Sequence, residues 1–182
     1  MGNKKIKFAV VGCGHIGKRH ASMILGNNDF ELVALCDTKP IEVLGLDNFN
    51  GARFFNSIDA LIQSGIEIDA VAIASPNGYH QEQALQVLEN NWHVVLEKPM
   101  ALTKAGCEQI IFKALQKQQQ VFCVMQNRYS PPSVWLKEVL VSGKLGKVFM
   151  VQINCYWNRD DRYYKPDATS GKSTTWHGTK AL

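Results

Sequence analysis

IKFAVV at 6–11, followed directly by GCGHIG at 12–17, is the stretch that decides the fold of this 182-residue chain. The first six residues form a short apolar run, which is typical of a buried parallel strand. The glycines that follow have the spacing G-x-G-x-x-G, and helical spacing begins at His15. A strand, these glycines and a helix in succession indicate a site for a dinucleotide, although the glycines alone could form a purely structural turn.

Each glycine of this stretch has a separate role in the expected site. Gly12 allows a tight turn, and Gly14 has no Cβ, so that a pyrophosphate can approach the backbone. Gly17 allows the helix to pack closely on the strand. The N-terminus of the helix, at His15 and Ile16, then faces the phosphates.

Asp37 ends the second apolar run and is the twentieth residue after Gly17. Its carboxylate can accept hydrogen bonds from the hydroxyls of the adenosine ribose, and it would repel a 2′-phosphate. It could also be a turn-forming residue ahead of Lys39-Pro40. The position predicts NAD, rather than NADP, as the cofactor.

Apolar runs and helical patterns alternate along the first two thirds of the chain. This alternation predicts a doubly wound parallel sheet of Rossmann type over 1–126, followed over 127–182 by the beginning of a second α/β domain. The predicted strands are 6–11, 32–36, 53–55, 69–74, 93–96, 121–125 and 147–157. The predicted helices are 15–26, 41–49, 58–63 (capped by Ser57), 79–90, 103–119 (capped by Thr103) and 131–142.

Three polar motifs follow predicted strands, at the edge of the sheet where ligands bind in this type of fold. SPNGYH at 75–80 is either a ligand-contacting loop or a helix-capping loop. EKP at 97–99 places Lys98 at the end of a buried strand, which favours a functional lysine over a solvated one. It would be a base, or a cation that polarises a hydroxyl or carbonyl oxygen. Arg128, in QNRY at 126–129, could bind a carboxylate or phosphate or form an interdomain salt bridge.

Composition excludes several function classes. The 20 basic and 16 acidic residues are interspersed, with no basic block of the kind that binds nucleic acid. The N-terminus has no apolar stretch long enough for a signal peptide or a membrane span, so we expect a cytoplasmic protein with no membrane partner. The five cysteines form no pair with metal-ligand spacing, which predicts reduced, buried thiols and no metal site.

The motifs together resemble one family, that of the glucose–fructose oxidoreductase and inositol dehydrogenase enzymes, which are NAD(P)-dependent sugar and polyol oxidoreductases. The matching stretches are AVVGCGHIGKRH at 9–20, CD at 36–37, SPNGYH at 75–80, EKP at 97–99 and QNRY at 126–129. The resemblance implies that Lys98 is the catalytic lysine, that Glu97 lies near the nicotinamide, and that His80 and Asn77 line the cofactor site. The cofactor-binding residues predicted in this way are Gly12, Gly14, His15, Ile16, Gly17, Asp37, Ser75, Pro76, Asn77, His80, Glu97, Lys98 and Gln126.

The stretches QNRY through DDRYY at 126–164 and WHGT at 176–179 look most like one branch of the family, which oxidises the 3-hydroxyl of UDP-N-acetyl-glucosaminuronic acid in the biosynthesis of O-antigen (lipopolysaccharide) sugars. The substrate residues that this implies are Arg128, Tyr129, Arg159, Tyr163 and Tyr164. Another sugar or polyol substrate, or a non-catalytic NAD(H)-binding module, remains an alternative.

The resemblance also implies residues that this chain lacks. Family members are longer and form homo-oligomers, and their second domain carries an Asp and a His beside the lysine. The sequence stops at Leu182, and His177 belongs to the preceding WHGT at 176–179. We therefore expect the chain to bind NAD but to be a poor catalyst by itself.

Overall fold

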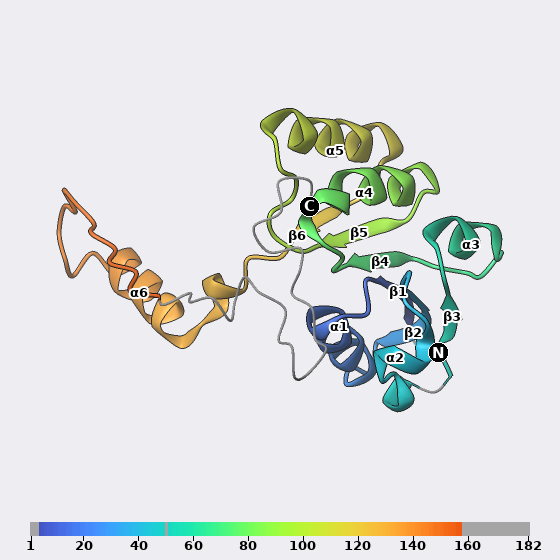
Figure 1. The fold of residues 1–182 in the computed structure, drawn as a ribbon. Coiled ribbons are helices and arrows are strands. Elements are labelled where there is room, and N and C mark those ends of the chain that lie inside the picture. Colours follow the sequence, from blue (N-terminus) through green and yellow to red (C-terminus); the bar gives the residue numbers. More distant parts are fainter. Residues whose placement is uncertain (1–3, 50, 158–182) are drawn as a thin grey trace. The chain divides into compact units, whose positions relative to one another are not determined.

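The computed structural model describes residues 4–49 and 51–157. The chain divides into two units, Met1–Val124 and Met125–Leu182. The first unit is an α/β sandwich around one sheet, and the second contains a helix and an irregular segment within its described residues (Figure 1).

The sheet of the first unit has six strands in the order β3-β2-β1-β4-β5-β6, and every neighbouring pair is parallel. The predicted doubly wound Rossmann fold is therefore confirmed. Strands β2 and β3 lie on one side of β1, and β4, β5 and β6 lie on its other side. The strand order therefore reverses between β1 and β4, and ligands bind at this point in such sheets. The strands are β1 Ile6–Val11, β2 Phe30–Cys36, β3 Arg53–Phe55, β4 Ala70–Ile73, β5 His93–Leu96 and β6 Val121–Cys123.

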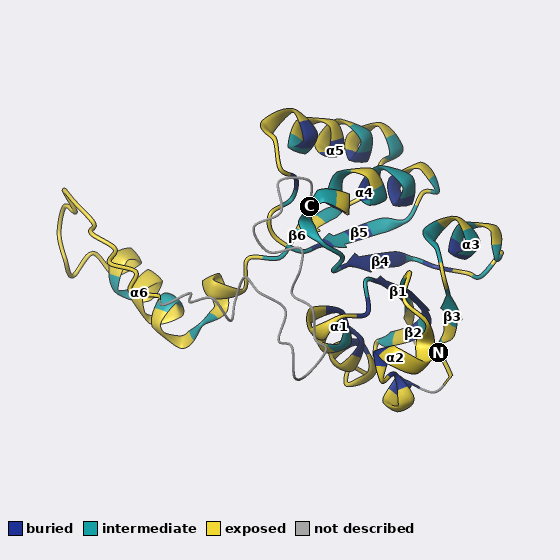
Figure 2. Cartoon of the chain, in the orientation of Figure 1, coloured by how far each residue is buried: buried dark blue, intermediate teal, exposed yellow. Residues whose placement is uncertain are grey.

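Helices cover both faces of this sheet (Figure 1). One buried cluster packs α1 and α2 against one face, and a second packs α3, α4 and α5 against the other. The central strand β4 is buried at all four positions (Figure 2) because its AVAI run is apolar on both faces. The helices are α1 His15–Leu25, α2 Ile41–Leu44, α3 Ile58–Gln63, α4 His80–Glu89, α5 Lys104–Lys117 and, in the second unit, α6 Pro131–Val141.

Two of these helices begin at the caps that the sequence predicts. The Ser57 hydroxyl accepts a hydrogen bond from Ala60 N at 3.1 Å, and the Thr103 hydroxyl accepts one from Gly106 N at 3.0 Å. Each bond satisfies a backbone N–H group that has no partner within its helix.

Two sequence predictions are wrong. The helix expected at 41–49 is divided, because Gly45 adopts a left-handed conformation (φ 58°) that ends α2 before a separate 3₁₀ turn at Asp47–Phe49. The strand expected at 147–157 does not form, and its residues are exposed. An alternating pattern becomes a strand only beside a partner strand, and the described residues of the second unit contain none.

Among the residues that the structure describes, none of the helices is long and apolar enough to cross a bilayer.

Candidate functional site

The loops that follow β1 and β4 meet at the carboxyl edge of the sheet. Gly12 N donates to Cys36 O at 2.8 Å, and Ala74 N donates to Val11 O at 2.8 Å. Gly12 has φ +87°, and a Cβ there would lie 2.5 Å from Ser75 N. Only glycine permits this backbone conformation and this close approach of the two loops.

The beginning of α1 leaves room for a ligand. Gly14, His15 and Ile16 are exposed, and a Cβ on Gly14 would meet no atom within 4 Å. No side chain caps the helix, and its first turn has no acidic residue. Unpaired N–H groups at the N-terminus of a helix, next to open space, fit the pyrophosphate of a dinucleotide.

Asp37 lies between the glycine loop and the turn that follows β2. Its Oδ2 accepts from Cys13 N at 2.7 Å, and its Oδ1 accepts from Lys39 N at 2.9 Å. The turn-forming role of Asp37 is therefore present, and its carboxylate also lies beside the glycine loop, while its contact with the ribose remains a prediction. Each carboxylate oxygen still has a lone pair for a ribose hydroxyl.

The loop after β4 holds Ser75 by a contact that sequence reasoning missed. The Ser75 hydroxyl donates to Gln83 Oε1 of α4 at 2.6 Å. The side-chain amide of Asn77 has no hydrogen-bond partner within the described part of the chain, which leaves it available to a ligand. The roles of Ser75, Pro76 and Asn77 in cofactor binding remain predictions.

His80 lies in the interior of the first unit. It is 0% exposed, and its role in cofactor binding remains a prediction. Nδ1 lies 2.7 Å from Pro99 O, and Nε2 lies 2.9 Å from Ser75 O. The ring supports the two loops from inside, and the SPNGYH spacing does not distinguish this role from a ligand contact.

Glu97 and Lys98 follow β5 on the same edge. Glu97 Oε1 lies 2.9 Å from His20 Nε2 of α1, a pair that the sequence analysis did not identify. The sequence feature that could have indicated this pair is the position of His20, one helical turn after Gly17 on the helix that packs against the sheet. The Lys98 side chain is exposed, and its ammonium has no hydrogen-bond or ion-pair partner among the described residues.

The second unit brings together two cations near its beginning. A hollow of about 630 Å³ is lined by Asn127, Arg128, Tyr129, Ser133 and Lys137. Gln126 begins the 3₁₀ turn Gln126–Tyr129 that carries Arg128. The other predicted substrate residues, Arg159, Tyr163 and Tyr164, and the WHGT segment lie outside the described residues.

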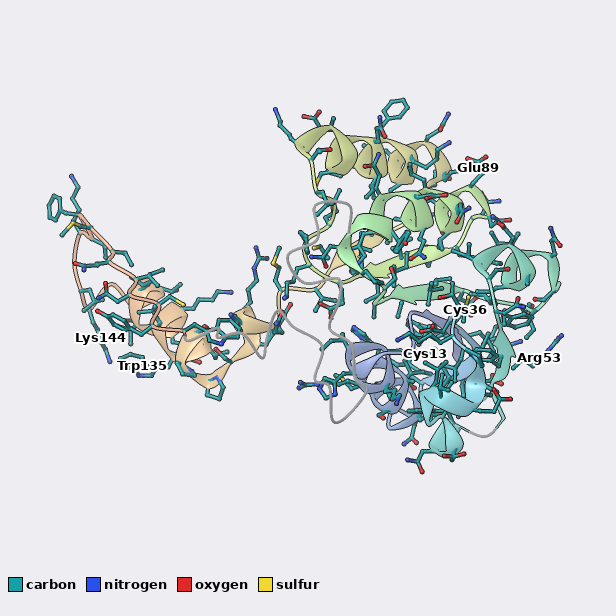
Figure 3. The ribbon with its side chains drawn as sticks, in the orientation of Figure 1. Cys13, Cys36, Arg53, Glu89, Trp135 and Lys144 are labelled. Carbon is teal, nitrogen blue, oxygen red and sulfur yellow. The ribbon has the colours of Figure 1, made fainter. Side chains whose placement is uncertain are left out.

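The five cysteines differ in how far they are buried. No cluster of metal-ligating side chains occurs within 4–49 and 51–157, and the five cysteines form no disulfide. Cys13 and Cys36 are buried where β1 and β2 end (Figure 3), and the Cys13 thiol lies 3.5 Å from Cys36 O. Cys107 and Cys123 are partly buried, and Cys155 is exposed, so the prediction of buried thiols is wrong for Cys155.

We expect an alkylating reagent to modify Cys155 quickly and Cys13 and Cys36 only after unfolding. Burial is the main cause that raises the pKa of both buried thiols from 9 to about 12. The folded state therefore retains these protons between pH 9 and about pH 12 while the unfolded state loses them, and this contribution to stability is lost as the pH rises through that range.

Mass spectrometry after a timed reaction with iodoacetamide measures the modification of each cysteine. The Cys155→Ser variant is the control, since it removes the fast site alone. Rapid modification of Cys13 in the folded protein would contradict the prediction.

Comparison with known proteins identifies the family. Residues 6–126 match the family model described as "Oxidoreductase family, NAD-binding Rossmann fold". The chain belongs to this family. The resemblance to glucose–fructose oxidoreductase and inositol dehydrogenase is thus confirmed, and the first unit is the NAD-binding Rossmann domain of the family.

Curated relatives and solved structures of the family match most of the chain. D-glucoside 3-dehydrogenase of Escherichia coli is 28% identical, over 82% of this chain and 43% of its own. The WlbA dehydrogenase of Bordetella pertussis, solved with NADH and UDP-GlcNAcA, has a TM-score of 0.82 and 34% identity, over 90% of this chain and 47% of its own. The Chromobacterium violaceum WlbA structure, solved with the same two compounds, has a TM-score of 0.82 and 30% identity, over 90% and 48%. The chain spans less than half the length of these proteins.

Proposed function

We propose that this protein transfers hydride between NAD(H) and a hydroxyl or ketone group of an anionic sugar, with Lys98 as the catalytic residue. The observation that carries this proposal is the position of Lys98. It is an exposed lysine without a partner in the described structure, at the carboxyl end of β5, and Glu97 beside it is bonded to the helix of the glycine motif. A lysine that served only solubility would not need this placement.

Different residues of the first unit bind different parts of NAD. The N-terminus of α1 and Gly14 hold the pyrophosphate, and Asp37 accepts the ribose hydroxyls. When bound, NAD supplies the hydride acceptor. In the direction of reduction, the Lys98 ammonium donates a hydrogen bond, and then its proton, to the ketone oxygen as the carbon gains hydride from NADH. In the direction of oxidation, the neutral Lys98 amine takes the hydroxyl proton as the carbon loses hydride to NAD.

The charge of the second unit favours an anionic substrate. Arg128 and Lys137 line one hollow, together with Tyr129. Two cations that face one space suit a carboxylate or a diphosphate better than a neutral polyol. We therefore favour a UDP-N-acetyl-glucosaminuronic acid, oxidised at its 3-hydroxyl for surface-polysaccharide biosynthesis, and the two WlbA structures solved with UDP-GlcNAcA support this choice.

Replacing Lys98 by Met will lower turnover of UDP-N-acetyl-glucosaminuronic acid by about 100-fold or more, because positioned proton donors contribute on that order. NADH affinity will change little, since the pyrophosphate and ribose contacts remain. Formation of NADH measures turnover, and quenching of protein fluorescence measures NADH binding separately.

Lys104→Met is the matched control, because Lys104 lies on α5 with a side chain that is 90% exposed and that pairs, in the part of the chain that the structure describes, with Glu108 alone. Turnover of inositol or glucose, and not of the UDP-sugar, would assign the protein to a neutral substrate. Equal turnover of the UDP-sugar by Lys98→Met and by the unsubstituted protein would contradict the proposal, and NADH binding with no turnover at all is the result expected of a non-catalytic NAD(H)-binding module.

A further inference from the structure

Two histidines reach the turn that carries Lys98 from two different helices. His80, the first residue of α4, is fully buried, and its ring lies between Ser75 O and Pro99 O. It therefore ties the loop after β4 to the turn after β5. The turn is held on the Pro99 side of Lys98 by this contact.

The second contact holds the other side of Lys98. His20 Nε2 of α1 donates to Glu97 Oε1 at 2.9 Å, and the two side chains are only 19% and 16% exposed. The other oxygen, Oε2 of Glu97, accepts the backbone N–H of Lys98 at 3.3 Å. The residue before Lys98 and the residue after it are thus each bonded to a histidine, while the ammonium itself is left unpaired among the described residues.

We propose that His20 and His80 are positioning residues that fix the Glu97-Lys98-Pro99 turn, so that the Lys98 ammonium meets a bound dinucleotide and its substrate in one place. The inference rests on the proposed function of Lys98. His20 belongs to the helix that begins at the glycine loop, and His80 bonds the loop that packs against Gly12. The helix of the glycine loop is therefore connected to the Lys98 turn through the His20 ring, and the loop after β4 is connected to it through the His80 ring.

The two partners of His80 are both backbone carbonyl oxygens, which only accept hydrogen bonds. A ring nitrogen that carries hydrogen can donate to the carbonyl oxygen beside it, and a phenylalanine ring at this position could donate to neither.

The test follows Lys98 by NMR in the full chain, after reductive methylation of its lysines with ¹³C-formaldehyde. Lys98→Arg identifies the Lys98 resonance by its loss. In the unsubstituted protein we expect NADH to shift this resonance. In His80→Phe and His20→Leu, which lack the N–H donors, we expect most of that shift to be lost while NADH is still bound.

Two further variants separate positioning from stability. His20→Gln retains an N–H donor for Glu97 and should restore the Lys98 response. His93→Gln is the matched control, since His93 lies at the opposite end of β5, where its ring accepts a hydrogen bond from Gln120 N and has no other hydrogen-bond partner within 4–49 and 51–157. This variant should leave the response unchanged. His20 is partly exposed, so its variants keep the test valid if His80→Phe fails to fold.

The outcomes distinguish this inference from the proposed function. If NADH binds to the unsubstituted protein without shifting the Lys98 resonance, the proposed role of Lys98 is wrong and the positioning role is lost with it. If the shift occurs and remains complete in His20→Leu and in folded His80→Phe, only the positioning role is overturned.

Discussion

Replacing Asp37 by Ala will weaken NADH binding and remove the preference for NADH over NADPH. Two unit charges about 4 Å apart repel each other by about 4 kcal/mol at an effective dielectric constant of about 20. If solvent screening halves this repulsion, about 2 kcal/mol remains, which corresponds to a preference of about 30-fold. The Ala variant loses the repulsion toward a 2′-phosphate as well as the acceptor for the ribose hydroxyls.

A second substitution separates charge from local structure at this position. Asp37 also accepts the backbone N–H of Cys13, so Ala removes a support of the glycine loop. Asp37→Asn keeps a carbonyl oxygen for that N–H group but has no negative charge. We expect Asn to lose the cofactor preference and to retain more of the NADH affinity than Ala.

Fluorescence titration with NADH and with NADPH measures both effects. Asp47→Asn, which changes an exposed acid in the 3₁₀ turn that follows α2, is the control for overall charge. If Asp37→Ala still binds NADH about 30-fold more tightly than NADPH, Asp37 does not select the cofactor.

Gly17→Ala will destabilise the first unit and prevent NADH binding. A Cβ on Gly17 would overlap the carbonyl oxygen of Gly12, and Val10 Cγ1 stands behind it at 3.5 Å. Backbone cannot move aside as the end of a flexible side chain can, so the helix must shift away from the strand. Overpacking of this kind lowers the free energy of unfolding by about 3 kcal/mol.

Gly14→Ala is the matched comparison, since it adds the same methyl group two residues after Gly12. The space around Gly14 is open, and its φ of −70° suits any residue. We expect the free energy of unfolding to change by less than about 1 kcal/mol, while NADH affinity falls about tenfold or more because the methyl occupies the path of the pyrophosphate.

Urea unfolding and NADH titration of both variants test whether Gly17 is needed for packing and Gly14 for the approach of the ligand. A stable Gly17→Ala protein that binds NADH normally would show that the glycine motif is not constrained as described. Equal destabilisation by both substitutions would indicate that Gly14 is structural rather than a place of ligand approach.

The sequence by itself determined the sheet and the edge on which the candidate site lies. The apolar stretches AVV at 9–11 and AVAI at 70–73 form strand segments that are buried on both faces, and the alternation with helices leaves a parallel, doubly wound sheet. The glycine spacing, Asp37 and Lys98 each follow a strand, so topology alone places them at the carboxyl edge. These features are local or follow from strand order, and for that reason they can be read from one chain.

The tertiary structure alone decided which side chains support the site. His20 and Glu97 are far apart in the sequence, as are His80 and Pro99, and no periodicity relates them. Tertiary structure also decided that residues 147–157 form no strand, because their alternating pattern has no partner strand among the described residues. Hydrogen bonds between distant residues depend on how helices and loops pack around the sheet, and this packing is a property of the whole fold rather than of any segment.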